Sequence, residues 1–172
     1  MTPILAPISA DAFLADVMAL AQQVSAKSWR PRFIIGVGRG GLVPAVYLSH
    51  ALGLPMLSVD ISSQVPDFAD GLLVRLAERT RAGETLLVVD DINDTGRTIA
   101  HLRGALAGAG ADANAVRFAT LIDNIRSVER VDYAARSIDR AVMKDWFVFP
   151  WEAVASRDAI TADAASVPER TA

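Results

Sequence analysis

Short apolar runs alternate with longer amphipathic stretches along this chain. The runs are rich in β-branched residues, and they predict strands at residues 33–37, 56–61, 86–89, 115–122 and 133–137. Apolar positions at helical spacing predict helices at residues 10–26, 42–52, 72–79 and 97–109. Strands that alternate with helices in this way are typical of an α/β fold with a mainly parallel, twisted sheet flanked by helices.

Two of the predicted helices have recognisable ends. Ser9 stands where an N-cap hydroxyl would accept a hydrogen bond at the start of the first helix, and Gly53 follows the second helix as a C-cap glycine. The first helix is expected to bury one face, formed by Phe13, Val17, Leu20, Ala21 and Val24.

Length and composition limit the classes of protein that this chain can belong to. Its 172 residues, 52% of them hydrophobic, are enough for one domain with a substantial core, which we predict at residues 1–152. The alanine-rich tail at 153–172 is predicted to be frayed or partly helical. The net charge of −3 gives no strongly basic surface, so we expect no nucleic-acid partner.

The chain also lacks several features that would place it elsewhere. It has no cysteine, which excludes disulfides, thiolate nucleophiles and cysteine-based metal sites. His50 and His101 are not at metal-ligand spacing, and we interpret them as packing or surface residues. No apolar run is long enough to span a membrane and the N-terminus has no signal-peptide pattern, so a cytoplasmic protein without a membrane partner is expected.

The most informative segment is the string DDINDTGRT at residues 90–98. It follows the apolar run 86–89 and leads into a predicted helix, so we expect the strand to end where the acids begin. Glycine allows the backbone to approach a ligand closely, and the N–H groups at a helix start favour a phosphate. Carboxylates before such a turn can accept hydrogen bonds from sugar hydroxyls. A plain strand end followed by a capped helix is the alternative for any single residue here.

As a whole, this string resembles the signature of type I phosphoribosyltransferases, enzymes that use 5-phosphoribosyl-1-pyrophosphate (PRPP). The resemblance implies that Asp90 and Asp91 hold the ribose hydroxyls and lie near a Mg²⁺ ion that the substrate oxygens mostly bind. It further implies that the 5′-phosphate binds to Asp94, Thr95, Gly96, Arg97 and Thr98, and that Asp94 is the general base.

A glycine-rich segment, GRGG at residues 38–41, follows the strand predicted at 33–37. A tight turn is one interpretation, but an arginine within it could add a charge-assisted contact to an anion surrounded by backbone N–H groups. The resemblance implies that Arg39, Gly40 and Gly41 bind the pyrophosphate of PRPP. It also makes the Gly38–Arg39 peptide a candidate for the cis form.

The aromatic cluster WFVFPWE at residues 146–152 suits a core and a lid over a flat heterocycle equally well by composition. Here the chain is similar to the 6-oxopurine phosphoribosyltransferases, particularly the short xanthine-guanine and archaeal-type hypoxanthine-guanine enzymes. In these a hood, here at about residues 123–152, closes over the purine. The resemblance implies that Trp146 stacks on the base, that the Phe147 backbone meets the ring edge and that Glu152 accepts from an N–H or amino group.

One position departs from this pattern. The family usually has a lysine that donates to the 6-oxo group of the purine, and the matching position here is Asn124. An amide can donate a hydrogen bond, but without the charge that strengthens it. The resemblance also places Ser62, Ser63 and Arg75 in a loop that covers the reacting centre, and it implies a homo-oligomer, either a dimer or a tetramer.

These observations predict a phosphoribosyltransferase that transfers the phosphoribosyl group of PRPP to a 6-oxopurine in purine salvage. Two alternatives stay open. One is a non-catalytic regulator of the same fold that senses PRPP, and the other is an enzyme whose acceptor is a pyrimidine, orotate or another amine.

Overall fold

A five-stranded parallel sheet forms the centre of the protein in a computed structural model that describes residues 3–60 and 70–166. Every pair of neighbouring strands in this sheet is parallel. The strands lie in the order β3 (Met56–Val59), β2 (Phe33–Val37), β4 (Leu86–Asn93), β5 (Val116–Asn124) and β6 (Tyr133–Ile138). The α/β fold predicted from the apolar pattern is therefore confirmed.

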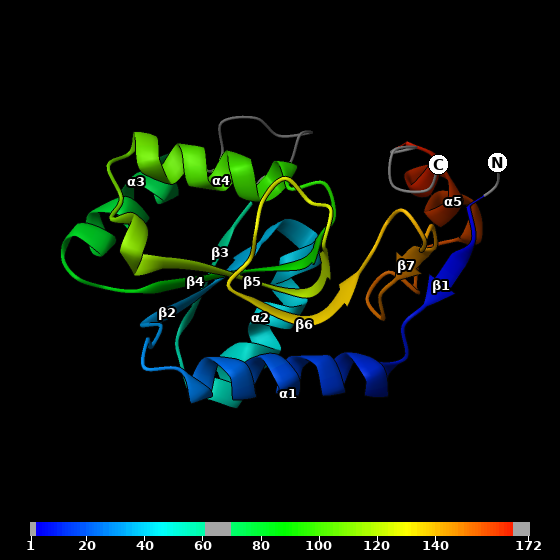
Figure 1. Ribbon diagram of the computed structural model, residues 1–172, viewed down its shortest axis with the longest axis horizontal. Helices are drawn as coiled ribbons and strands as arrows, with labels where there is room; N and C mark the ends of the chain where they lie inside the picture. The colour runs from blue at the N-terminus through cyan, green and yellow to red at the C-terminus, as the bar shows by residue number, and fades with distance from the viewer. Residues whose placement is uncertain (1–2, 61–69, 167–172) are drawn as a thin grey trace.

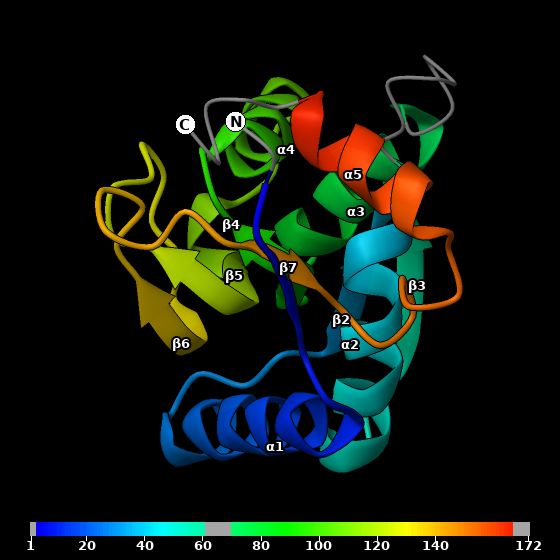
Figure 2. The same ribbon diagram turned by 90° about the vertical axis from the view of Figure 1, so that its right-hand side faces the viewer.

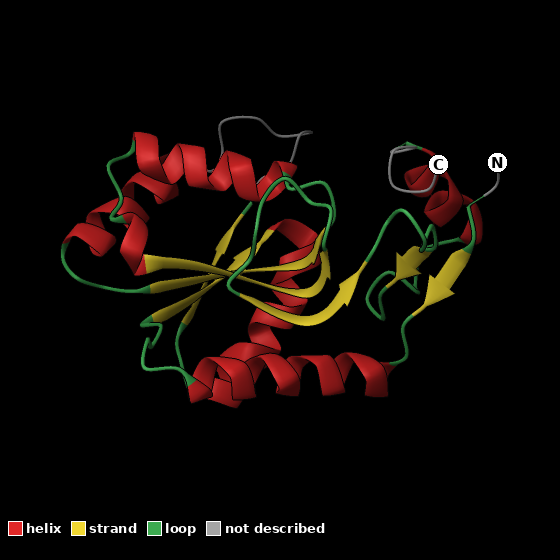
Figure 3. Cartoon of the chain, in the orientation of Figure 1, coloured by secondary structure: helices red, strands yellow, loops and turns green. Residues whose placement is uncertain are grey.

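Helices cover both faces of this sheet, as Figures 1 and 3 show. α1 (Ala10–Ala26) and α2 (Gly38–Leu52) pack on one face, and α3 (Asp70–Arg81) and α4 (Arg97–Gly108) pack on the other. Each face has its own apolar core, because strands buried on both sides carry apolar residues at successive positions. None of the described helices is long and apolar enough to cross a membrane.

α1 forms as its sequence predicts. The Ser9 hydroxyl accepts a hydrogen bond from the Ala12 N–H at 3.1 Å, which satisfies one of the free donors of the first turn. The face predicted to be buried is buried at all five positions: Phe13, Val17, Leu20, Ala21 and Val24.

A second, two-stranded sheet lies beside the carboxyl end of the first. β1 (Leu5–Pro7) and β7 (Trp146–Val148) pair in parallel, and Figure 2 shows them side by side. The apolar pattern did not predict β1, because a three-residue strand is too short to show alternation. The predicted tail contains α5 (Arg157–Ala165), which is capped by the Ser156 hydroxyl.

Three local predictions are wrong. β4 does not end at the first acid but continues to Asn93, because its ladder with β5 runs on through Asp90↔Thr120 and Asn93↔Asp123. α2 begins at Gly38, so the GRGG segment is its first turn rather than a loop before residue 42. The Gly38–Arg39 peptide is trans, since the described residues contain no cis peptide bond.

Candidate active site

A cleft of about 470 Å³ opens where the carboxyl ends of β2 and β4 meet the starts of α2 and α4. This is the edge of a parallel sheet at which α/β proteins bind ligands. The cleft brings together many of the residues that the sequence singled out, namely Arg39, Gly40, Asp90, Asp91, Thr98, Trp146 and Glu152.

The two consecutive acids, Asp90 and Asp91, line the cleft. Their side chains are half-buried, and each accepts a local backbone hydrogen bond: Asp90 Oδ1 from the N–H of Asp91 at 3.0 Å, and Asp91 Oδ1 from the N–H of Ile92 at 2.7 Å. These bonds orient the two carboxylates, and a carboxylate can accept several hydrogen bonds or bind a cation.

The glycines of the GRGG segment are needed for packing as well as for a ligand. A Cβ at Gly41 would lie 2.1 Å from the Val89 carbonyl oxygen, and one at Gly40 would lie 2.5 Å from Asp91 Oδ2. Only glycine lets the first turn of α2 lie this close to β4. That approach places the exposed side chain of Arg39 beside the acids in one cleft.

The turn at residues 94–98 leads into α4 through a glycine N-cap. Gly96 is the N-cap residue at φ 89°, a left-handed conformation that favours glycine, and its side-chain-free position makes no capping hydrogen bond. A helix start of this kind is a typical binding site for an anion. A Cβ at Gly96 would lie 2.8 Å from the Glu129 backbone nitrogen, so the turn rests against the segment after β5.

A buried polar network that the sequence did not predict lies next to this turn. The Asn93 amide donates to Asp123 Oδ1 at 2.7 Å and to the Glu129 carbonyl at 2.9 Å, and the Ser127 hydroxyl donates to Asn93 Oδ1 at 2.9 Å. Polar residues at the ends of two apolar strands were the available signal, because such residues must find partners when buried.

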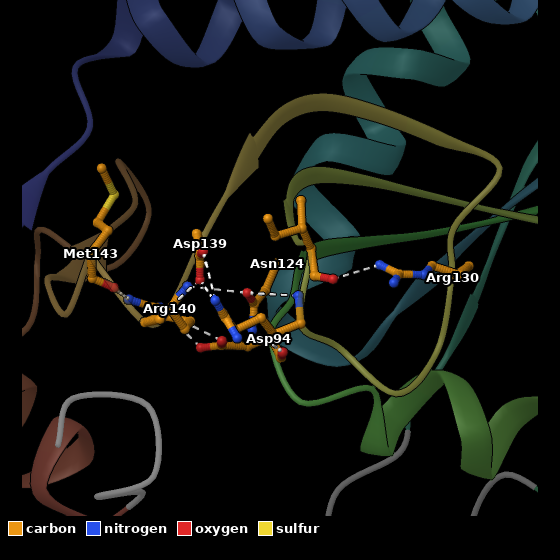
Figure 4. Close-up of polar contacts among 9 residues, drawn as sticks. Asp94, Asn124, Arg130, Asp139, Arg140 and Met143 are labelled. Carbon is orange, nitrogen blue, oxygen red and sulfur yellow. Dashed lines mark hydrogen bonds and ion pairs between the residues drawn. The ribbon is translucent and has the colours of Figure 1, made fainter.

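Asp94 forms a buried ion pair with Arg140 (Figure 4). Arg140 Nε donates to Asp94 Oδ1 at 3.0 Å and Nη2 donates to Oδ2 at 2.9 Å, and the two residues are only 4% and 7% exposed. A general base must instead lie near the base edge and reach the proton that it removes. The catalytic role of Asp94 therefore stays a prediction. It would require the carboxylate to accept from Arg140 and from the base together.

Asn124 lies in the same polar cluster but does not line the cleft. Its side chain is 5% exposed, its Nδ2 donates to the Asp94 carbonyl at 2.9 Å, and its Oδ1 accepts from the N–H groups of Arg126 and Arg140. Figure 4 shows it beside Asp94 and Arg140. These contacts give Asn124 a role in joining backbone segments, and its predicted contact with the base has no support from this geometry.

The aromatic cluster serves both purposes that its composition allowed. Trp151 stacks on Phe149 at 4.8 Å between ring centroids and meets Phe13 of α1 edge-on, so these rings belong to the core. Trp151 also lines the main cleft. Trp146 lines the main cleft and, in addition, a smaller adjoining hollow of about 80 Å³. That hollow is lined by Asp91, Ile92, Asp94, Arg140, Trp146, Phe147, Phe149 and Glu152.

Glu152 lines both the main cleft and the smaller hollow. Burial raises the pKa of this carboxyl, the nearby charge of Asp163 raises it further, and the Phe149 N–H bond and the charge of Arg39 lower it. Asp163 and Ile160 line the cleft from α5, which means that part of the predicted tail belongs to the wall of the site. Alanine-rich composition gave no signal of this.

The remaining predicted residues do not line the cleft, or they fall outside the described residues. Ser62 and Ser63 fall outside the described residues. Arg75 is exposed on α3 and does not line the cleft. Thr95 and Arg97 are in the turn at residues 94–98, where the Thr95 hydroxyl accepts a long hydrogen bond from the Arg97 N–H at 3.4 Å.

The fold and the cleft define an α/β protein with a ligand-sized cleft at the carboxyl edge of a parallel sheet, the edge at which such proteins bind ligands. A family model described as the phosphoribosyl transferase domain matches residues 8–156, so the chain belongs to this family and is a phosphoribosyltransferase. The resemblance stated from the sequence is thereby confirmed.

Solved structures agree with this assignment. The chain is similar to a purine phosphoribosyltransferase from Pyrococcus horikoshii Ot3, with 26% identity and a TM-score of 0.64 over 86% of this chain and 94% of that one. It is also similar in fold to a xanthine-guanine-hypoxanthine phosphoribosyltransferase from Helicobacter pylori (20% identity, TM-score 0.64, 93% and 99% covered). A protein from Neisseria gonorrhoeae with bound ppGpp shares the fold (21% identity, TM-score 0.70, 96% and 98% covered).

Proposed function

We propose that the protein transfers the phosphoribosyl group of PRPP to a 6-oxopurine, with release of pyrophosphate, and so serves purine salvage. The observation that supports this proposal is that one cleft brings the predicted residues together. It is lined by Arg39, Asp90, Asp91, Thr98 of α4 and Trp146. The 5′-phosphate would bind at the start of α4, the ribose at the acids and the pyrophosphate near the first turn of α2.

In the proposed reaction, the bond between the ribose C1 and the pyrophosphate oxygen breaks as a bond to purine N9 forms. Asp94 would take the proton that leaves purine N7, and Trp146 would stack on the base. Positive charge develops at C1 as the leaving group departs, so positioning and electrostatic stabilisation supply most of the rate enhancement. Asp90 and Asp91 would stabilise that charge from the ribose side.

A Mg²⁺ ion fits this cleft as a companion of the substrate. Asp90 and Asp91 are half-buried oxygen donors on the cleft wall, whereas no group of three or more potential ligands among residues 3–60 and 70–166 could hold a metal on its own. Two carboxylates suit an ion that is mostly held by substrate oxygens. When bound, Mg²⁺ would screen the negative charge of the pyrophosphate and ribose oxygens.

Pyrophosphate release tests this proposal directly. PRPP and Mg²⁺ are offered with xanthine, guanine, hypoxanthine, adenine, uracil or orotate separately, and we expect turnover with at least one 6-oxopurine. Since a neighbour in fold was solved with ppGpp, that compound is added as a competitor. PRPP binding without turnover on any base would instead support a regulator, and turnover only on uracil or orotate would support a different acceptor.

Asp94→Asn is the matching variant for the general base. We expect turnover to fall by about 100-fold or more while PRPP binding, measured by calorimetry, changes little. Asp139→Asn is the control, because Asp139 precedes Arg140 in the chain but forms its ion pair with Arg126, an exposed residue. Equal loss of turnover and PRPP binding in Asp94→Asn would contradict the role of Asp94. The cytoplasmic location and the homo-oligomer remain predictions.

A further inference from the structure

The guanidinium of Arg140 lies at the base end of the cleft, although no sequence motif points to it. It lines the smaller hollow together with Trp146, Phe147 and Glu152, and its Cζ lies 5.2 Å from the centroid of the Phe147 ring. Arg140 comes from the segment between β6 and β7, and Figure 4 shows it beside Asn124, one of the predicted base-binding residues. A buried cation in this place needs a reason, because burying a charge is costly unless it is paired.

The hydrogen bonds of Arg140 hold the guanidinium in one orientation. Nε and Nη2 donate to the two oxygens of Asp94, and Nη1 donates to the carbonyl of Asp145 at 2.7 Å and to that of Met143 at 3.3 Å. An arginine has five N–H donors in a planar fork. Four are therefore in use, and the second N–H of Nη2 has no acceptor among the described residues.

The position of this donor matters because Asn124 cannot supply it. Asn124 is buried, has no surface on the hollow, and uses its amide for the Asp94 carbonyl. A 6-oxo group in the hollow would therefore receive no hydrogen bond from Asn124. Arg140 is the cation that lines the hollow, and hydrogen bonds from charged donors are stronger than those from neutral ones.

The Arg140–Asp94 pair also complements both polar groups on one edge of a 6-oxopurine. A purine that is about to lose its N7 proton presents a 6-oxo acceptor next to an N7–H donor. Arg140 and Asp94 present an N–H donor next to a carboxylate acceptor, 2.9 Å apart. Each carboxylate oxygen accepts more than one hydrogen bond, so Asp94 can hold Arg140 and accept from N7 together.

We propose that Arg140 is a specificity-determining residue for the base, and that the Arg140–Asp94 pair recognises the 6-oxo and N7–H edge of the purine. This inference rests on the proposed function. A 6-aminopurine places an amino donor where the 6-oxo acceptor would be. Its N–H groups would face the guanidinium, leaving donors on both sides without acceptors, and a site of this kind rejects such a base strongly.

The test compares kcat/KM for hypoxanthine and adenine in the wild type and in Arg140→Gln. Glutamine keeps an N–H donor but removes the charge and the planar fork. We expect the preference for hypoxanthine over adenine to fall by about 10- to 100-fold, the size expected for one charge-assisted hydrogen bond. PRPP affinity should stay within about 3-fold of the wild type, because the phosphate and ribose groups lie elsewhere in the cleft.

Two further variants keep the test decisive. Arg126→Gln removes an exposed arginine from the neighbouring ion pair with Asp139, and it should leave the base preference unchanged. If Arg140→Gln does not fold, Arg140→Lys decides, because a single ammonium cannot bind both carboxylate oxygens and donate to the base. An unchanged preference in the folded variant would overturn the inference.

Turnover by the wild type distinguishes failure of this inference from failure of the proposed function. Turnover on hypoxanthine with an unchanged preference in the variants leaves the function standing and removes Arg140 from base recognition. A wild type that uses no purine contradicts the proposed function, and the inference is then overturned with it.

Discussion

At the scale of single residues, Glu152 shows how the cleft changes the chemistry of a side chain. Its pKa is raised chiefly by burial and also by the negative charge of Asp163, against the smaller opposing effects of the Phe149 N–H bond and of Arg39. A hydrogen bond that Glu152 accepts from the base is strongest when the carboxylate is ionised. As the pH is lowered, base binding should therefore begin to weaken at a higher pH than it would if Glu152 had the pKa of an ordinary glutamate.

The pH dependence of base binding checks this cause. With Asp163→Asn, the like charge is gone and the pKa of Glu152 should fall, so the acid limb of log(1/KM) for the base should move to lower pH. Asp158→Asn removes the same charge from the first turn of α5 and is the control. A limb that stays in place in Asp163→Asn, or that moves equally in both variants, would contradict the coupling of Asp163 to Glu152.

The residue scale also marks where sequence reasoning stopped. Asp90, Asp91, Gly96 and Thr98 stand within one short string, so their side-by-side placement follows from local chemistry. Arg140 pairs with Asp94 across 46 positions of the chain, and no local pattern shows which of the chain's many arginines would do so. Long-range partners of this kind come from topology rather than from periodicity.

At the scale of elements, the strands and helices were more predictable than their ends. Apolar periodicity placed the core-facing residues of α1 and the positions of all five central strands. It ended β4 too early, because acids are unusual in a buried strand while the ladder with β5 continues past them. It missed β1, and it did not show that α5 lines the cleft.

The contribution of α5 is testable through its cap. Ser156→Ala removes the hydroxyl that accepts from the Ala159 N–H, which should destabilise this helix by about 1 kcal/mol. Because Ile160 and Asp163 line the cleft, we expect KM for the substrates to rise about 2- to 5-fold. Steady-state kinetics and a thermal melt measure the two effects.

Ser9→Ala is the matched control for this experiment. It removes the equivalent cap of α1, where the Ser9 hydroxyl accepts from the Ala12 N–H, and it should lower Tm without changing KM. If Ser9→Ala and Ser156→Ala raise KM alike, the effect is one of general stability and α5 has no special role in the site.

At the scale of the whole molecule, one ion pair joins the helical layer to the edge of the sheet. Arg136 Nη2 of β6 lies 2.7 Å from Asp16 Oδ2 of α1, so the opposite charges attract one another. Burial raises the pKa of Asp16 more than Arg136 lowers it. The folded state therefore binds this proton more tightly than the unfolded chain does.

This gives a pH-dependent prediction for the free energy of unfolding. The contribution of Asp16 is complete below its unfolded-state pKa and is lost as pH rises through its higher folded-state pKa. Asp16→Asn should thus gain stability over the wild type as pH rises, whereas Arg136→Met should lose about 1–3 kcal/mol near neutral pH and little in acid. Urea denaturation across a pH series measures both, and a pH-independent difference for either variant would contradict the argument.

The pairing of β1 with β7 has a consequence for how the protein is made. Leu5–Pro7 leave the ribosome before the central sheet is made, yet their partner, Trp146–Val148, follows only after the whole central sheet. Contacts between segments so far apart form late and slow the final stage of folding. The nascent chain can therefore assemble the central sheet and its helices while β1 is still unpaired, and Trp146 reaches its place only after the central sheet has been synthesised.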